Sequence, residues 1–203
     1  YRLPLVYGNA ITNGSLNSSC YTFGNGDISG VGTALRRFTD YNGNAISGAR
    51  ISGAQSAILV WQDALNLVSD VKLETNGPGC YDYVTFKVNR DELQQGNVVL
   101  AVKDGSGTII WSWHIWFTDE PATSEIGGAY WMDRNLGATC ANIKGDIKSC
   151  GLYYQWGRKD PMRAPASWDG TFSATTPELG ESEQEIPVSE INGTIAASIA
   201  NPR

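Results

Sequence analysis

The feature that most constrains the fold is a pair of apolar segments joined by a short polar turn. Residues 97–103 read Asn-Val-Val-Leu-Ala-Val-Lys, and residues 108–117 form a second apolar run that contains three of the seven tryptophans. Between them stands Asp104-Gly105-Ser106-Gly107, and an Asp-Gly pair supplies the positive φ angles that tight hairpin turns require. The sequence therefore predicts a β-hairpin over residues 97–117.

The second segment of this hairpin has two different faces. Successive side chains of a strand point to opposite sides of the sheet, so alternate residues share a face. One face is expected to carry Trp111, Trp113, Ile115 and Phe117, and the other Ser112, His114, Trp116 and Thr118.

Other segments also indicate β structure. Residues 56–61 form a continuous apolar run, residues 65–73 are a second candidate strand, and Val84, Phe86 and Val88 alternate with polar or aromatic neighbours. Residues 8–56 are rich in Gly, Asn and Ser, which is typical of loops between short strands. We therefore expect a mainly β fold, with an immunoglobulin-like β-sandwich over residues 1–118.

A break in this pattern predicts a domain boundary. Pro121 stands among small polar and acidic residues, so residues 119–127 are interpreted as a linker and residues 128–203 as a second domain. In that domain residues 129–132 and 152–156 are candidate strands, residues 177–190 an exposed loop, and residues 194–200 a short helix.

Composition excludes some classes of partner. The chain has 203 residues, a net charge of −6 and a pI near 4.8, and its basic residues are scattered. Nucleic acids and anionic membranes select clustered Lys and Arg, so neither is expected as a partner. No apolar run reaches the length of a membrane-spanning helix.

The first residues carry no initiator Met and no apolar leader, and residues 1–7 resemble the middle of a strand. We interpret the chain as an excised or processed piece, so the missing targeting signal says nothing about where the parent protein resides.

The four cysteines suit an oxidising compartment. Their number is even, no Cys-x-x-Cys pair occurs, and the chain has one histidine. A Cys140–Cys150 bridge is predicted across a short polar loop, where it would stabilise the fold by roughly 2 to 3 kcal/mol. A Cys20–Cys80 bridge is a further prediction, and free buried thiols are the alternative.

Residues 130–161 combine aromatic, glycine and charged residues in an order that no simple periodicity explains. They include Trp-Met-Asp-Arg-Asn-Leu-Gly-Ala-Thr at 131–139 and Gly-Leu-Tyr-Tyr-Gln-Trp-Gly-Arg-Lys-Asp-Pro at 151–161. These motifs resemble the Fibrobacter-type major paralogous (FISUMP) domain of secreted and surface proteins in Bacteroidetes. Residues 6–11, 56–68 and 96–120 resemble the part that precedes this domain in fimbrillin-like surface lipoproteins of Bacteroidales.

The resemblance implies a fold, a location and a type of function. It implies that residues 128–203 are the first part of a C-type-lectin-like α+β domain, incomplete because the family's later tryptophan-rich half is absent. Met162 also departs from the family, in which an aromatic residue follows Lys-Asp-Pro. It implies a parent protein exported to the outer membrane and exposed on the extracellular side of the cell. No catalytic or ligand-binding residue of the family is established, so none is carried over.

The chemistry-bearing residues predict binding rather than catalysis. A single histidine, His114, excludes histidine triads and multi-histidine metal sites, and no catalytic residue, metal or cofactor is expected. Asp133, Arg134, Arg158, Lys159 and Asp160 are expected to pair with one another around aromatic rings, with ligand contact or acid–base catalysis as alternatives. The candidate ligand-binding residues are Trp116, Trp168, Arg134, Arg158 and Asp160.

Three hypotheses about function follow. The first is a non-enzymatic module of the cell surface or of a fimbrium that mediates adhesion; its partner would be a glycan, a host or bacterial surface protein, or other fimbrial subunits. The second is a carbohydrate-binding accessory protein of a polysaccharide-utilisation system, which requires an exposed coplanar pair of tryptophans. The third is a lectin-fold enzyme, which requires a reactive thiol at Cys140 or Cys150.

Overall fold

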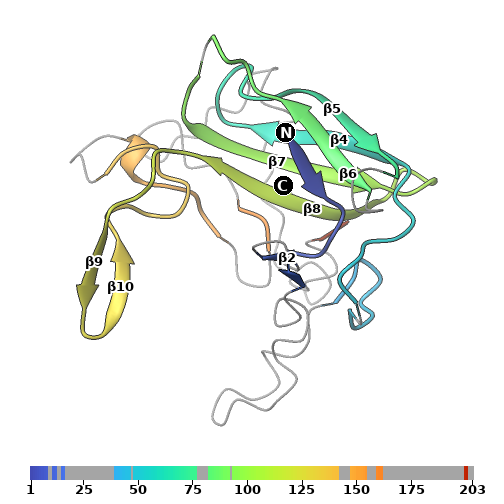
Figure 1. The fold of residues 1–203 in the computed structure, drawn as a ribbon, viewed down its shortest axis with the longest axis horizontal. Helices are drawn as coiled ribbons and strands as arrows, with labels where there is room; N and C mark the ends of the chain where they lie inside the picture. Colours follow the sequence, from blue (N-terminus) through green and yellow to red (C-terminus); the bar gives the residue numbers. More distant parts are fainter. Residues whose placement is uncertain are drawn as a thin grey trace.

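We analysed a computed structural model of the chain. It describes residues 1–8, 11–12, 15–16, 39–46, 48–76, 82–91, 93–141, 147–154, 159–161 and 199–200. The fold of these residues is mainly β and consists of antiparallel sheets (Figure 1). No helix among them is long and apolar enough to cross a membrane.

The predicted hairpin is confirmed and forms the centre of the fold. Strands β7 (Gly96–Lys103) and β8 (Ile109–Phe117) pair antiparallel, and Asp104 closes the turn by accepting hydrogen bonds from the Ser106 and Thr108 amides, each at 2.9 Å. Strand β4 (Ser56–Gln62) pairs with the other edge of β7, which gives the sheet order β4-β7-β8.

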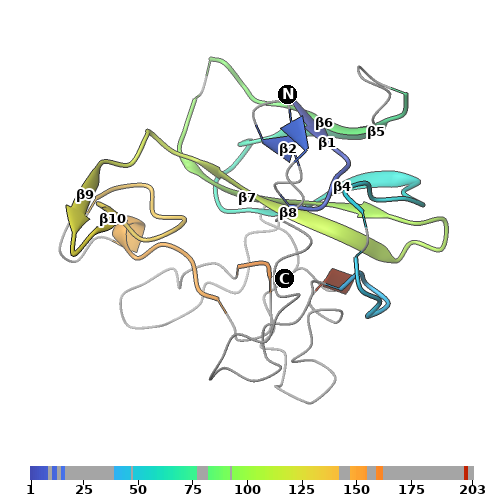
Figure 2. The ribbon, with the colours of Figure 1, turned by 60° about the horizontal axis from the view of Figure 1, so that its bottom comes forward.

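A second sheet covers one face of this one. Strand β6 (Tyr83–Lys87) lies between β1 (Arg2–Pro4) and β5 (Ser69–Glu74), all antiparallel. Figure 2 shows the two sheets as successive layers. Their facing side chains form one apolar core, in which Val84 and Phe86 of β6 meet Val98, Leu100 and Val102 of β7. The alternation that predicted a strand with one buried face at residues 83–88 is thus confirmed.

The two faces of β8 are as predicted. Trp111, Trp113, Ile115 and Phe117 belong to or pack against the core between the sheets. Their alternate neighbours lie on the second face of the β4-β7-β8 sheet, where Ser112 contacts Asp160 and Thr118 contacts Arg134.

This second face is also buried along β7. Val99 and Ala101 have no exposed surface, although neither belongs to the core between the sheets. A register shift in β4 between Leu59 and Trp61 pairs Trp61 with Val99, and Trp61 is likewise buried. A one-residue bulge of this kind reverses which side of the sheet the following side chains take.

Residues from the predicted second domain help to cover this face. The Asn97 side-chain Nδ2 donates a hydrogen bond of 2.8 Å to the Gly137 carbonyl, and Ala138 is buried. A 3-10 turn, η3 (Ile147–Ser149), follows, and the Leu152 amide bonds the Leu136 carbonyl at 3.0 Å. Ile199, also from the predicted second domain, has no exposed surface and belongs instead to the apolar core that includes Val84 and Leu100.

Part of the predicted linker is a strand. Strand β9 (Thr123–Ile126) pairs with β10 (Ala129–Met132), the second of which was predicted. Gly127 and Gly128 join them with φ angles of 62° and 80°, the two positive values of a type I′ turn. A smaller hairpin pairs β2 (Ile11–Thr12) with β3 (Ser15–Leu16). No named strand includes residues 152–154 of the predicted strand 152–156, and the rest of that strand and the predicted loop 177–190 lie outside the described residues.

We predict that Gly137→Ala loosens the contact between residues 135–152 and β7. Gly137 has a φ of +84°, and a Cβ there would lie 2.5 Å from Leu152 Cγ. Overpacking of this degree costs about 2 kcal/mol or more of unfolding free energy, measured by urea denaturation. The control is Gly107→Ala, because Gly107 has a similar φ of +88° but nothing near its Cβ position. Equal losses in the two variants would show that Leu152 does not press on this position.

Candidate functional site

A buried ion pair joins residues 159–160 to the second face of β8. Asp160 is 2% exposed, and its Oδ2 accepts hydrogen bonds of 2.6 Å from both the Ser112 hydroxyl and the Lys159 ammonium. Lys159 also donates to the Ser112 hydroxyl and, at 2.9 Å, to the Ser112 carbonyl, and it lies 4.7 Å from the centre of the Trp111 ring. We name Ser112, Lys159 and Asp160 the Ser112 cluster.

The contacts of the Ser112 cluster hold residues 159–160 against β8. A serine beside a lysine can serve as a nucleophile and its base, but an ammonium group has three donors and Lys159 directs them at three oxygens of the cluster. Ser112 is 3% exposed and its hydroxyl donates to Asp160. The Lys159–Asp160 pair agrees with the predicted structural pairing of the charged residues, and Asp160, a candidate ligand contact, is buried.

His114 is held in a neighbouring polar network. The Asn97 amide nitrogen donates to Asp63 at 2.7 Å and to the Gly137 carbonyl at 2.8 Å, so its oxygen is left to accept from His114 Nε2 at 2.9 Å. This assigns the proton of a neutral imidazole to Nε2. Burial lowers the pKa of His114 below 6.5, and the negative charge of Asp160 opposes that shift in part.

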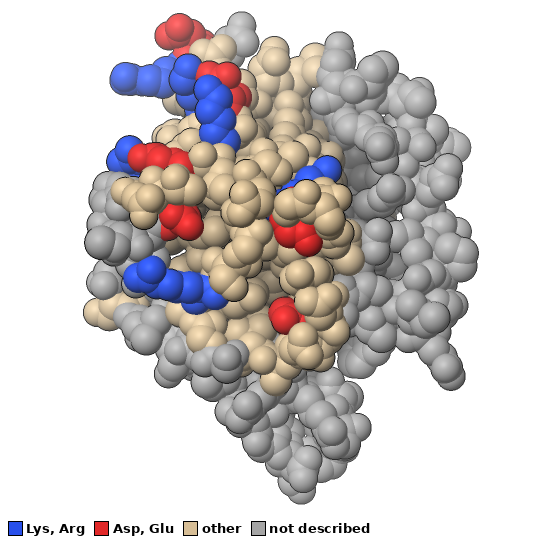
Figure 3. Space-filling model, turned by 90° about the vertical axis from the view of Figure 1, so that its right-hand side faces the viewer, with Lys and Arg blue, Asp and Glu red and all other residues tan. Residues whose placement is uncertain are grey.

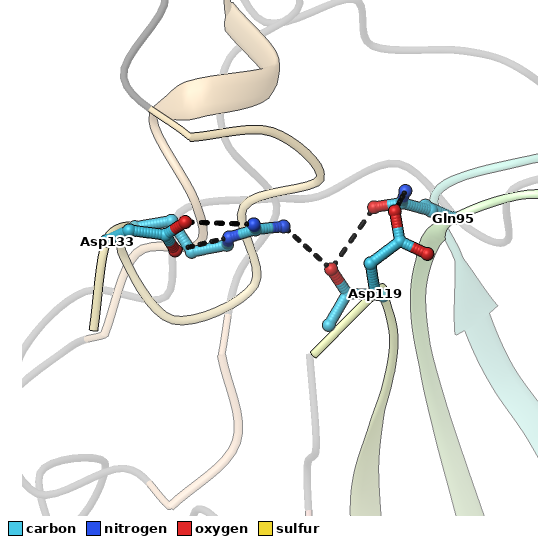
Figure 4. Close-up of polar contacts among 5 residues, drawn as sticks. Gln95, Asp119 and Asp133 are labelled. Carbon is cyan, nitrogen blue, oxygen red and sulfur yellow. Dashed lines mark hydrogen bonds and ion pairs between the residues drawn. The ribbon is translucent and has the colours of Figure 1, made fainter. Parts of the chain in front are cut away.

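A chain of polar contacts connects the base of the β9–β10 hairpin to β8 and β7 (Figure 4). Arg134 donates to both Asp133 oxygens, at 2.7 and 3.1 Å, and to the Thr118 hydroxyl at 3.2 Å. Thr118 donates to Gln95, which donates to Asp119 at 2.9 Å. Hydrogen bonding by Arg134 lowers the pKa of Asp133. Arg134, a candidate ligand contact, is thus largely committed to positioning the hairpin.

The β9–β10 hairpin exposes the main group of large apolar side chains. All eight of its strand residues are exposed, and it projects from the sheets (Figure 1). Exposed fractions reach 76% for Tyr130, 59% for Trp131, 47% for Met132 and 65% for Ile126. A hollow of about 420 Å³ lies at its base, lined by Trp131, Met132, Asp133, Arg134, Asn135, Leu136 and Ser149.

Neither Trp116 nor Asp160 is among the described residues that line this hollow. Trp116 is partly buried on β8, and its ring nitrogen is buried with no hydrogen-bond partner among the described residues. Trp168 and Arg158 lie outside the described residues. The aromatic residues of the hairpin were therefore missed as site residues. The Gly127-Gly128 turn signal, flanked by two strand-length segments, was the evidence that could have identified them.

The predicted Cys140–Cys150 disulfide is absent from the structure, in which both are free cysteines of intermediate exposure. A bridge requires the two Cβ atoms to face each other. Here the Thr139 amide donates a hydrogen bond of 2.9 Å to the Lys148 carbonyl, so Thr139 lies opposite Lys148. Cys140 and Cys150 are one and two residues beyond this pair. Cys20 and Cys80 lie outside the described residues.

The charged groups of the described residues on the opposite end of the molecule do not gather into another site. Figure 3 shows the end of the molecule that faces away from the hairpin, where acidic and basic groups of the described residues lie mixed among uncharged surface. No group of three or more potential metal ligands occurs among the described residues. Comparisons with protein-family models, with curated proteins and with solved structures found no match.

We predict that the titration of His114 lies below pH 6.5, because burial disfavours its charged form. Between that lowered pKa and 6.5 the unfolded chain binds more protons than the folded one, so stability falls as the pH drops through this window. The chain has one histidine, so its NMR ring signals need no assignment. His114→Gln should remove this part of the pH dependence of urea unfolding; an unshifted titration would contradict the burial.

We predict that Lys159→Met destabilises the fold by about 3 kcal/mol, because it leaves the Asp160 carboxylate buried without its cation. Adding Asp160→Asn removes the orphaned charge and should recover more than half of this loss. Urea unfolding of both single variants and the double variant measures the coupling between the two side chains. Additive losses would show that the pair does not act as a unit.

Proposed function

We propose that this protein is a non-enzymatic adhesion module of the bacterial cell surface or of a fimbrium, and that the β9–β10 hairpin is its binding element. In this proposal residues 1–118 form an immunoglobulin-like β-sandwich, and residues 128–203 belong to a C-type-lectin-like domain on the extracellular side of the outer membrane. The motif resemblance supports this assignment. The observation that carries the function is the exposure of Tyr130, Trp131 and Met132 on one projecting strand.

These residues have the composition of a binding surface. Interfaces are enriched in Tyr, Trp, Met and Arg, and exposed large apolar groups mark interaction sites. By strand alternation Tyr130 and Met132 share one face of the hairpin and Trp131 lies on the other. Ile126 and Leu136, 65% and 44% exposed, extend the apolar surface from the hairpin to the hollow. The contacts of Arg134 at the base of the hairpin hold this surface in a defined position.

The charged groups of the described residues favour binding over catalysis. Asp133 is paired with Arg134 and Asp160 with Lys159, so neither carboxylate stands free as an acid or a base. The two belong to different networks, one at the hairpin and one on β8. A paired-carboxylate mechanism needs both groups on opposite sides of one substrate bond.

The arrangement of tryptophans favours a protein ligand over a glycan. Trp61, Trp111 and Trp113 are buried and Trp116 is partly buried, so within the described residues Trp131 alone is largely exposed. The coplanar pair that a carbohydrate-binding accessory protein would use does not occur in this part of the chain. A surface protein or another fimbrial subunit is accordingly the preferred class of partner.

We predict that the variant Tyr130→Ser/Trp131→Ser loses at least tenfold in affinity for whichever surface ligand the protein binds. The measurement is biolayer interferometry against bacterial surface fractions, matrix proteins and host glycans. Leu93→Ser is the control, because Leu93 is 74% exposed but lies between β6 and β7. Ligand binding that is unchanged in the double variant would remove the hairpin from the proposal.

A further inference from the structure

The outer edge of β10 pairs with no other strand among the described residues, so its backbone groups are on offer there. In an antiparallel pair, hydrogen-bonded residue pairs alternate with pairs whose N–H and C=O groups point away from the ladder. The Asp133 amide donates a hydrogen bond of 2.8 Å to the Ala122 carbonyl, so Asp133 and Ala122 are a hydrogen-bonded pair. Because such pairs recur at every second position, Trp131 and Ser124 are the next hydrogen-bonded pair toward the turn. Tyr130 and Met132 therefore direct their backbone groups to the outer edge.

Within the part of the chain that the structure describes, this edge lacks the features that normally prevent strand addition. Exposed edges are protected by charged residues, proline, bulges or a covering segment. Strand β10 reads Ala-Tyr-Trp-Met, its pairing with β9 is regular, and all four residues are exposed. An isolated two-stranded hairpin is only marginally stable in water, so a further strand would stabilise it.

The order of residues in β10 allows it to pair with itself. If two copies meet antiparallel about a two-fold axis at Trp131, Tyr130 of each copy stands opposite Met132 of the other. Both residues present their backbone groups to the edge, so the two pairs form four hydrogen bonds. The two Trp131 rings face each other across the axis, and each Tyr130 ring contacts a Met132 thioether, both of which are favourable pairings.

We propose that the occupant of this edge is β10 of a second copy of the chain, which makes a continuous sheet in the order β9-β10-β10-β9. Charge supports β10 over β9 as the contact, because β10 is uncharged whereas β9 carries Glu125. This inference rests on the proposed function and deepens it: the adhesive contact is homophilic, between identical modules on neighbouring subunits or cells.

The size of the contact sets its strength. Pairing of four residues per copy is much smaller than the roughly 1,600 Å² interface of a stable complex. The dimer is therefore weak in solution and gains strength where many copies are held on one surface. Each chain carries a net charge of −6, so the copies repel at long range, and added salt should strengthen the association by screening.

Sedimentation equilibrium with charge-reversed variants tests the proposal. Trp131→Lys and Trp131→Glu each place two like charges on the two-fold axis of the dimer. Because Trp131 is 59% exposed, neither substitution should disturb folding, and circular dichroism of each variant checks this. Wild type should self-associate in a salt-strengthened manner, each variant alone should lose at least tenfold in affinity, and an equal mixture of the two should recover it. Tyr130→Pro, which removes the N–H that points to the edge, should also abolish association.

Three outcomes would overturn the inference. The first is a wild type that stays monomeric up to about 1 mM, a concentration at which even a contact of about 4 kcal/mol would be detected. The second is a mixture of Trp131→Lys and Trp131→Glu that associates no better than either variant alone. The third is a monomeric wild type that binds a foreign protein or glycan through the hairpin. The last outcome would leave the proposed adhesive function in place. Self-association with the predicted variant pattern but no surface binding would instead support the dimer and count against adhesion to other ligands.

Discussion

Burial of both faces of β7 is the constraint on which the rest of the structure depends. Every residue from Val98 to Val102 has no exposed surface. One face is covered by the sheet β1-β6-β5, and Gly137, Lys159 and Asp160 contact the other side of the β7–β8 pair. A strand that is apolar on both sides needs covering from both sides, so the later segments complete the fold of the earlier ones.

Polar contacts at the second face supply specificity. Apolar side chains alone would not select one position for residues 135–138 and 159–161 on the sheet. Asn97 binds the Gly137 carbonyl, and Ser112 binds Asp160, so a hydrogen bond fixes each of these two short segments. Because the base of the hairpin is tied to β8 through Arg134 and Thr118, the apolar surface of β10 is directed outward.

The sequence predicts those elements whose pattern is local. The alternation at residues 83–88 and 111–118 identified the strands and the correct faces, since one face is far more apolar than the other. Strand β9 was missed because Pro121 and the polar residues before Gly127 outweighed the Gly-Gly turn signal. Asp160 and Ser112 are 48 positions apart in the sequence. Their contact depends on a polar residue within a strand, and no periodic pattern in the sequence predicts such a contact. The disulfide prediction rested on loop length and took no account of the register between residues 139 and 148.

Residue-resolved amide hydrogen exchange, measured at several protein concentrations, tests two linked claims most directly. They are that β7 is buried on both faces and that the outer edge of β10 is free to pair with a second copy. The amides of residues 98–102 should exchange only through global unfolding, at every concentration. The Tyr130 and Met132 amides should exchange rapidly in dilute solution and gain protection as the concentration rises. Rapid exchange along β7, or protection of Tyr130 and Met132 that does not depend on concentration, would contradict the account.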